Sequence, residues 1–241
     1  MQPYTLAQLQ RDFNNAPSLP ADASDIKAET TSGPFRISLD QLGTFFGLQA
    51  SFRVYAPPIP GMSDNLAALA LEVTEVENAA GENLVEGDRQ SDALQLDTHW
   101  QDKSRLHGQA NLRFETRAEE ADIRKLKGAL QLRLPRKVQS VMIDNMTVGT
   151  QVGEGDSTVT LKRIDDEGFS LDFGNHQSAL VAVNAYNAQG DNLWVPHPRI
   201  ENKDGRWLGR FDTHGTFEKI ELLLATEQDE TAFPFELSLQ D

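Results

Sequence analysis

A short pattern that occurs twice constrains the architecture of this 241-residue chain more than any other feature. The segment ENAAGENLV at 77–85 returns as YNAQGDNLW at 186–194, and both contain Asn-Ala-x-Gly-acid-Asn-Leu at an offset of 109. A second pair follows in the same order, because GQANLRFET at 108–116 and GRWLGRFDT at 205–213 share Arg-Phe-acid-Thr at an offset of 97. Two matches in one order predict a tandem duplication. The offsets differ by 12, so we expect about 12 additional residues in the first copy, within 91–104.

Each repeated pattern predicts one local structure, a hairpin turn for the first and a strand for the second. The first predicts a hairpin in which a strand ends at Asn78 or Asn187, and Gly81 or Gly190 completes the turn, since glycine adopts positive φ without steric cost. The second predicts a strand whose central phenylalanine points into the core. Those two residues are Phe114 and Phe211.

Most of the remaining chain consists of short segments in which apolar and polar residues alternate. This period of two is clearest at 233–239, and it predicts antiparallel sheets with one buried face. The same alternation occurs at 69–73, 94–100, 129–135, 158–162, 169–173 and 180–186. We expect a core that includes Leu71, Val73, Leu130, Leu132, Phe169, Leu171, Val181, Val183, Phe233 and Phe235.

The N-terminus departs from this alternation. Thr5 and Gln8 have the spacing of a capping box, and Leu6, Leu9 and Phe13 fall on one helical face. The sequence therefore predicts one short helix over 5–13. The proline-containing stretch that follows, 14–25, is typical of an irregular strap.

From residue 33 onward the chain resembles tandem immunoglobulin-like domains. The resemblance implies an all-β fold of two antiparallel β-sandwiches, with the short helix in front of them. It implies a topology and no chemistry. We expect three parts: the helix and strap at 1–32, the first sandwich at 33–136, and its internal duplicate at 137–241. The boundary is placed after 129–135 because Pro135 is expected to end a strand.

Charge and composition exclude several classes of function. With 22 Lys and Arg against 37 Asp and Glu, the net charge of −15 repels nucleic acid and anionic membranes. No apolar run is long enough for membrane insertion. The chain has no cysteine, which excludes disulfides, zinc–thiolate sites and thiol nucleophiles. We expect neither a nucleic-acid partner nor a cofactor.

The sequence contains no recognisable catalytic or metal-binding motif. The nucleophile elbow, the P-loop and the HExxH motif are missing, and no two of the five histidines have the spacing that would hold one metal. We therefore predict that the protein is not an enzyme and binds no metal. Acidic clusters at 165–168 and 227–230 are interpreted as solvated hairpin turns, with calcium as the alternative.

Positive charge gathers in one segment of this acidic chain. Its cations alternate with acidic residues, so we interpret them as salt-bridged outer faces of strands, with a patch for an anion or acidic partner as the alternative. They are Arg113, Arg117, Arg124, Lys125, Lys127, Arg133, Arg136 and Lys137.

Two tryptophans distinguish the second copy from the first. Trp194 and Trp207 occupy the places of Val85 and Ala110, and large aromatic side chains next to polar groups can anchor a partner. Packing of both rings in the core is the alternative. The predicted binding site consists of Trp194, His197, Arg199, Arg206 and Trp207.

By elimination, we expect a non-enzymatic binding or spacer module of a bacterial envelope or secreted protein that recognises a protein or glycan partner. The first alternative is a carbohydrate-binding accessory module that uses Trp194 and Trp207. The second is a hydrolase with a site at the domain junction. No basic n-region or apolar h-region follows Met1, yet we expect a periplasmic or extracellular location.

Overall fold

The computed structural model of this chain is all-β apart from one short helix. The all-β class expected from the alternating segments is confirmed. The structure describes residues 5–13, 15–20, 26–43, 47–59, 69–85, 89–91, 94, 96–98, 105–114, 122–153, 158–174, 180–193, 195, 199–203 and 206–239.

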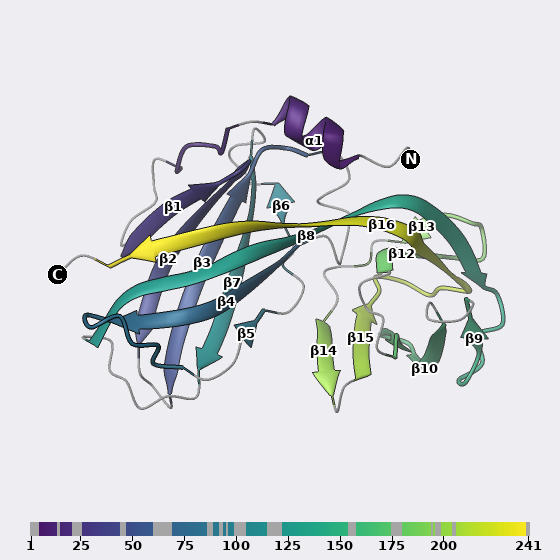
Figure 1. The fold of residues 1–241 in the computed structure, drawn as a ribbon. Helices are drawn as coiled ribbons and strands as arrows, with labels where there is room; N and C mark the ends of the chain where they lie inside the picture. Colours follow the sequence, from purple (N-terminus) through teal and green to yellow (C-terminus); the bar gives the residue numbers. More distant parts are fainter. Residues whose placement is uncertain are drawn as a thin grey trace. The chain divides into compact units, whose positions relative to one another are not determined.

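The helix α1 (Leu6–Asp12) begins as the sequence predicts. The backbone N–H of Thr5 donates to Oε1 of Gln8 over 2.8 Å, and the backbone N–H of Gln8 donates to Oγ1 of Thr5 over 3.2 Å. This capping box satisfies donors that the first turn leaves without helical partners. Leu9 is fully buried, so one face of α1 packs on the core (Figure 1).

The chain divides into two compact units. The N-terminal unit contains the described residues of 4–63, 68–134 and 229–241, and the C-terminal unit contains those of 135–228. The division lies close to the boundary expected at residue 136. The last residues differ from the expectation, because 229–241 were assigned to the second sandwich and instead belong to the N-terminal unit.

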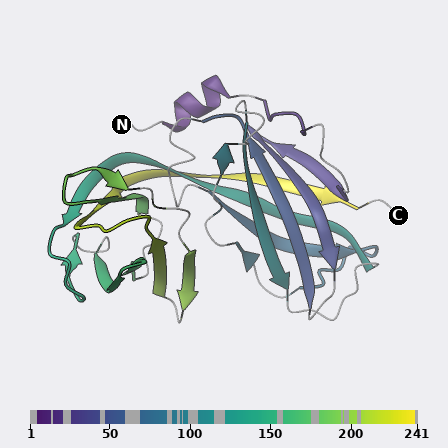
Figure 2. The same ribbon diagram turned by 180° about the vertical axis from the view of Figure 1, so that it is seen from behind.

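The N-terminal unit contains a five-stranded antiparallel sheet with the order β1-β2-β3-β7-β6. Figure 2 shows this sheet in front of the strands that cover its inner face. Its strands are β1 (Ala28–Ser32), β2 (Phe35–Gly43), β3 (Leu48–Ala56), β7 (Leu106–Phe114) and β6 (Asp97–Thr98). The covering strands β4 (Leu69–Asn78), β5 (Arg89–Gln90) and β8 (Ile123–Ile143) belong to a six-stranded sheet.

The C-terminal unit repeats this strand order. Its five-stranded sheet has the order β14-β15-β11-β10-β9, which is the first sheet with every strand number raised by eight. The six-stranded sheet has the order β13-β12-β16-β8-β4-β5, in which β12, β13 and β16 take the roles of β4, β5 and β8. The strands are β9 (Gln151–Val152), β10 (Val159–Asp165), β11 (Gly168–Asp172), β12 (Leu180–Tyr186), β13 (Asn192–Leu193), β14 (Arg199–Lys203), β15 (Arg206–Asp212) and β16 (Lys219–Ser238).

The repeated Asn-Gly turn has one hydrogen-bond pattern in both copies. The side-chain oxygen of Asn78 accepts from the backbone N–H groups of Ala80 and Glu82, and Gly81 has a φ of +79°. Asn187 accepts in the same way from Gln189 and Asp191, and Gly190 has a φ of +85°. The turn chemistry inferred from the sequence is therefore correct at both positions.

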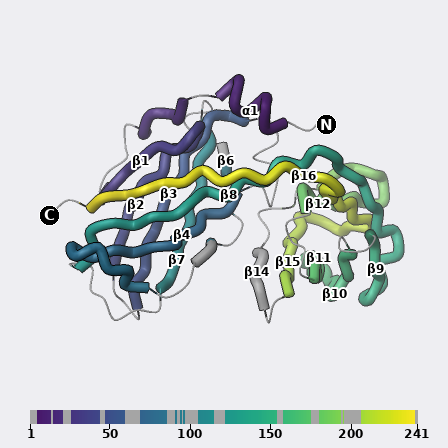
Figure 3. Tube along the Cα trace, viewed as in Figure 1, coloured from purple at the N-terminus to yellow at the C-terminus, as the bar shows by residue number. Residues whose placement is uncertain are grey.

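Two long strands, β8 and β16, are neighbours in the six-stranded sheet, and each contributes to both units (Figure 3). The expectation that Pro135 ends a strand is wrong, because β8 continues through it to Ile143. The ladder between β4 and β8 ends at Leu69 and Leu132. Pro135 lies beyond that ladder, where a missing N–H removes no bond to β4.

Each unit has its own hydrophobic core. Phe114 and Phe211 are fully buried, as their pattern predicts. Of the expected core residues, Val181, Val183 and Phe233 are only partly buried. Those confirmed as buried are Leu71, Val73, Leu130, Leu132, Phe169, Leu171 and Phe235.

The two acidic clusters have different structures. The first forms the turn between β10 and β11, where the side chain of Asp165 accepts a 3.0 Å hydrogen bond from the N–H of Glu167. The prediction of a second hairpin turn at 227–230 is wrong, because these residues lie inside β16. Arg133 and Arg136 on the neighbouring strand β8 pair with Glu230 and Glu227, so the charges are accommodated on extended backbone.

Candidate functional site

A pocket lined by both polar and apolar residues lies in the N-terminal unit, on the outer face of β2, β3 and β7. Its volume is about 460 Å³. Side chains alternate between the two faces of a strand, so the inward residues of these strands build the core and the outward ones build the pocket. It is lined by Lys27, Gln41, Leu42, Gly43, Gln49, Ala50, Ser51, Asn111, Leu112 and Arg113.

Strand register arranges the polar lining residues in two rows. In one row, Gln49 on β3 lies opposite Gly43 on β2 and Arg113 on β7. The other row has Ser51 at its centre, opposite Gln41 and Asn111. Because directly opposite residues of paired strands are neighbours, three strands bring these groups together that are distant in the sequence.

Two side-chain hydrogen bonds from Gln109 fix polar residues at one side of the pocket. Nε2 of Gln109 donates to Oγ of Ser51 over 2.9 Å and to Oδ1 of Asn111 over 3.4 Å. The first bond ties β7 to β3 through side chains, in addition to the backbone ladder. These bonds orient Ser51 and Asn111 at the pocket.

Gly43 leaves space beside the pocket. A Cβ atom built at Gly43 would have no heavy atom within 4 Å. In the C-terminal unit the corresponding position is Arg163. The repeated residues Phe114 and Phe211 lie opposite Leu48 and Phe169, so the next residues, Gln49 and Ser170, correspond. Gly43 pairs with Gln49, and Arg163 pairs with Ser170. The absence of a side chain at this position therefore distinguishes the N-terminal unit from its duplicate.

The described lining of the pocket differs in charge from the chain as a whole. Lys27 and Arg113 line it, and none of the described lining residues is acidic. The protein as a whole has a net charge of −15. Charges within a Debye length, about 8 to 10 Å at physiological salt, dominate the potential that a bound group experiences. The two cations of the lining are therefore close enough to act on a group bound there.

The binding site predicted in the C-terminal unit is only partly described. Trp194 and His197 lie outside the described residues. Arg199 begins β14 with its backbone opposite Arg210, and its side chain is not described. Arg206 and Trp207 are consecutive on β15, so their side chains point to opposite faces. Trp207 is partly buried against the C-terminal core, whereas Arg206 is exposed and pairs with an acidic residue.

That acidic residue is Asp172, which the sequence did not single out. Nη2 of Arg206 lies 2.6 Å from its Oδ2, and the N–H of Gly174 donates to its Oδ1 over 2.9 Å. Burial raises the pKa of Asp172, but the bonds from Arg206 and Gly174 outweigh it and hold the pKa below the usual value. The pair is a structural ion pair on the outer face of the sheet.

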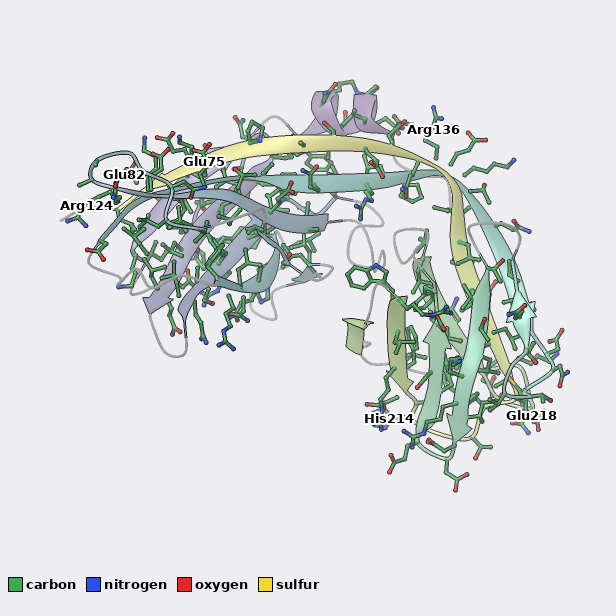
Figure 4. The ribbon with its side chains drawn as sticks, turned by 60° about the horizontal axis from the view of Figure 1, so that its bottom comes forward. Glu75, Glu82, Arg124, Arg136, His214 and Glu218 are labelled. Atoms are coloured by element: carbon green, nitrogen blue, oxygen red, sulfur yellow. The ribbon has the colours of Figure 1, made fainter. Side chains whose placement is uncertain are left out.

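The basic segment is salt-bridged where the structure gives its ion pairs, as its first interpretation predicts. Nζ of Lys127 contacts the carboxylates of Glu75, at 2.7 Å, and Glu77. The hydrogen bond from Lys127 lowers the pKa of Glu77. Glu75 and Arg124 are labelled in Figure 4. The further pairs are Lys125 with Glu236, Arg133 with Glu230, and Arg136 with Glu227, and Arg117 lies outside the described residues.

Sequence reasoning did not find the pocket, because its residues form no motif. Arg113 was noted only as part of the basic segment. One signal was present in the chain, namely the difference between the copies at Gly43 and Arg163. Using it requires the strand register, which aligns β2 with β10 where the sequences share no pattern.

The described residues also bear on metal binding and on membrane insertion. Within the described ranges, no group of three or more His, Asp or Glu side chains is placed to hold a metal ion. The same ranges contain no helix that is long and apolar enough to cross a membrane.

Comparisons with known proteins add no family. No protein-family model matches the chain, and no curated protein matches it. One similar solved structure is the conserved domain protein from Bacillus anthracis, at 7% sequence identity over 96% of this chain and 94% of that chain. Its TM-score of 0.22 is too low to support a conclusion about fold or function.

Proposed function

We propose that the protein is a non-enzymatic binding module of a bacterial envelope or secreted protein, built from two immunoglobulin-like sandwiches, and that it recognises a macromolecular partner through the pocket of its N-terminal unit. One observation carries the proposal: a concave surface lined by Lys27 and Arg113, without a described acidic lining residue, in a chain of net charge −15. The partner presents an anionic group there.

The shape and position of the pocket support this role. Binding sites are concave and place a few polar groups at defined positions, and here these groups, apart from Lys27 just before β1, project from paired strands. A protein can recognise an anionic partner through a local patch of cations, even where its own net charge is negative like that of the partner. The pocket meets both requirements.

The test uses two anionic polymers, poly-glutamate and polygalacturonate, as probes. We expect at least one to bind the intact protein and the affinity to fall as salt concentration rises. The double variant Lys27→Ala/Arg113→Ala removes both cations and should lose binding. The matched control is Arg210→Ala, which removes the arginine at the corresponding register position of the C-terminal unit, because Arg210 lies opposite Ser170 as Arg113 lies opposite Gln49.

The results decide whether the pocket is the recognition site. Binding that the double variant loses and the control retains supports the pocket as the recognition site. If neither polymer binds at low salt, or if the double variant binds as the wild type does, the pocket is not a site for an anionic partner. Melting curves of all variants establish that a loss of binding is not a loss of fold.

A further inference from the structure

We infer that one end of the outer face of the sheet β1-β2-β3-β7-β6 is a docking site for an extended, proline-containing segment of another protein, and that residues 15–20 of the strap occupy this site in the free chain. The site lies apart from the pocket and uses none of its lining residues. Tyr55, which belongs to the new site, is four residues from Ser51 along β3, and this distance is about 13 Å. Three features carry the inference: the contacts of the strap, the surface at that end of the sheet, and the length of β3.

Two arginines hold the strap by its backbone carbonyls. Nε of Arg36 donates to the carbonyl oxygen of Pro17 over 2.7 Å, and Nη1 of Arg105 donates to that of Ser18 over 2.7 Å. Arg36 lies on β2 and Arg105 directly precedes β7, with β3 between these two strands. The strap therefore crosses the end of the sheet near β3, on the side of the unit where α1 lies (Figure 1).

The strap has the chemistry of a segment that another peptide can replace. Pro17 and Pro20 fix φ near about −65° and favour extended backbone at the residue before each of them. Among the described residues, 15–20 makes no hydrogen bonds besides the two from the arginines. Both of these bonds use carbonyl oxygens, so recognition does not depend on the N–H that proline lacks. An extended segment of another protein with prolines three residues apart offers the same kind of acceptor.

A polar network fixes the outer face at this end of the sheet. Tyr55 lies opposite Arg36, and its hydroxyl accepts a 3.2 Å hydrogen bond from Arg53. Nη2 of Arg53 lies 2.8 Å from Asp40, which also accepts from Ser38 over 2.7 Å. Tyr55 and Ser38 point away from the core, yet they are 1% and 0% exposed, so the chain covers this end of the face. An aromatic side chain held by hydrogen bonds is the kind of surface that binds proline-rich segments.

The additional length of β3 distinguishes the N-terminal unit from its duplicate. Leu48 and Phe169 correspond, because they lie opposite the repeated Phe114 and Phe211. From Leu48, β3 continues to residue 56, whereas β11 ends at Asp172, three residues after Phe169. The arginine and tyrosine of the polar network belong to the part of β3 that has no counterpart in β11. The structure therefore assigns the docking site to the N-terminal unit.

The experiment titrates the full chain with a capped peptide of the sequence Asn-Ala-Pro-Ser-Leu-Pro, that of residues 15–20. A variant in which these residues are replaced by Gly-Ser-Gly-Ser-Gly-Ser should bind the peptide at one site. We expect wild type to bind at least about tenfold more weakly, since its own strap occupies the site. Pro17→Gly/Pro20→Gly should have an intermediate affinity, because glycine makes ordering of the strap more costly. Amide chemical shifts measured by NMR report binding, and melting curves report folding.

Further variants and a second peptide locate the site. In the chain with the replaced strap, Arg36→Ala/Arg105→Ala removes both carbonyl donors and should weaken peptide binding by at least about tenfold. The matched control Arg163→Ala/Arg210→Ala removes two arginines from the five-stranded sheet of the C-terminal unit and should leave peptide binding unchanged. A peptide with alanine at both proline positions should bind about 3- to 10-fold more weakly, since it loses more conformational freedom.

Four results would reject the inference. If the folded strap variants bind the peptide no more tightly than wild type, the strap does not occupy a docking site. If both strap variants fail to fold, the strap is a structural element that no partner replaces. If Arg36→Ala/Arg105→Ala leaves the affinity unchanged, the peptide binds elsewhere. If the alanine peptide binds equally well, the site does not select proline. The anionic polymers test the pocket separately, so none of these results decides the proposed function.

Discussion

The two copies of the repeat carry different chemistry on the outer faces of their five-stranded sheets. In the N-terminal unit Ser51 accepts a hydrogen bond from Gln109, a neutral pair beside an open pocket. At the same positions in the C-terminal unit, Asp172 accepts from Arg206. The buried Phe114 and Phe211, which align the two copies, have not changed. Core and turns fix the fold, whereas outer faces accept substitutions that change the chemistry.

The long strands show a second exchange of charge. Lys127 on β8 is held by the carboxylates of Glu75 and Glu77. Its counterpart on β16 is Glu221, which pairs with Asn184 as Lys127 pairs with Glu75. Glu221 accepts hydrogen bonds from Ser140, Tyr186 and Asn184 at 2.5, 2.7 and 3.0 Å. A cation between anions in one copy thus corresponds to an anion between neutral donors in the other.

The ion pairs between β8 and β16 involve the same exchange of charge between corresponding positions. Arg133 and Glu227 each lie six residues after the central charge of their copy, and Arg136 and Glu230 lie nine residues after it. Arg133 pairs with Glu230, and Arg136 with Glu227. Two identical strands in this register would face arginine with arginine. One strand carries arginines at these positions and the other carries glutamates, which favours pairing of β8 with β16 over pairing of either strand with a copy of itself.

The largest predicted effect tests whether the end of β16 belongs to the N-terminal core. Phe235 is 6% exposed and meets Phe52 edge-on, with ring centroids 6.4 Å apart. Phe235→Ala should lower the free energy of unfolding by about 3 to 5 kcal/mol in urea denaturation. The control is Glu236→Ala on the exposed face, which should cost under about 1 kcal/mol. A loss below about 1 kcal/mol for Phe235→Ala would show that this strand does not complete the core.

A smaller effect separates Asp172 from Ser51 through pH. The folded pKa of Asp172 is lowered, so its ionised form stabilises the protein at pH above the unfolded value of about 3.9. That contribution is lost as pH falls through the folded pKa. Asp172→Asn should cost about 1.5 to 3 kcal/mol at pH 7, with the difference from wild type shrinking below about pH 4.

The matched variant in the N-terminal unit is Ser51→Ala. It removes a neutral acceptor, so its cost, measured by the same urea denaturation, should not change between pH 7 and pH 3. Equal pH profiles for Asp172→Asn and Ser51→Ala would contradict the claimed difference between the two outer faces.

The smallest predicted effect concerns the cluster around Glu221. The hydrogen bond to Glu221 and burial raise the pKa of Tyr186, and bonds from Ser140 and Tyr186 lower that of Glu221. Tyr186→Phe should cost about 0.5 to 1.5 kcal/mol. In a spectrophotometric titration, Glu221→Gln should lower the pKa of Tyr186 toward 10, because phenolate formation no longer meets a neighbouring negative charge. An unchanged titration would show that the two groups do not interact.

The sequence by itself determined the local features of this protein. Thr5 and Gln8 specify the start of the helix, since both partners of a capping box lie within one turn. Asn78 and Asn187 specify their turns, because each side chain bonds backbone groups two and four residues ahead. Alternating residues such as Leu71 and Val73 specify the buried faces of strands.

Tertiary structure decided what depends on partners distant in the chain. Pro135 predicts the end of a strand, but β8 continues beyond it beside β16, and the proline costs no hydrogen bond to β4 because that ladder ends at Leu132. The acids at 227–230 predict a turn, but they lie in β16, which pairs with β8, and Arg133 and Arg136 on β8 contact two of them. The pocket arises only when register brings Gly43, Gln49 and Arg113 into one row. Spacing along the chain does not encode such a row, since long-range pairing creates it.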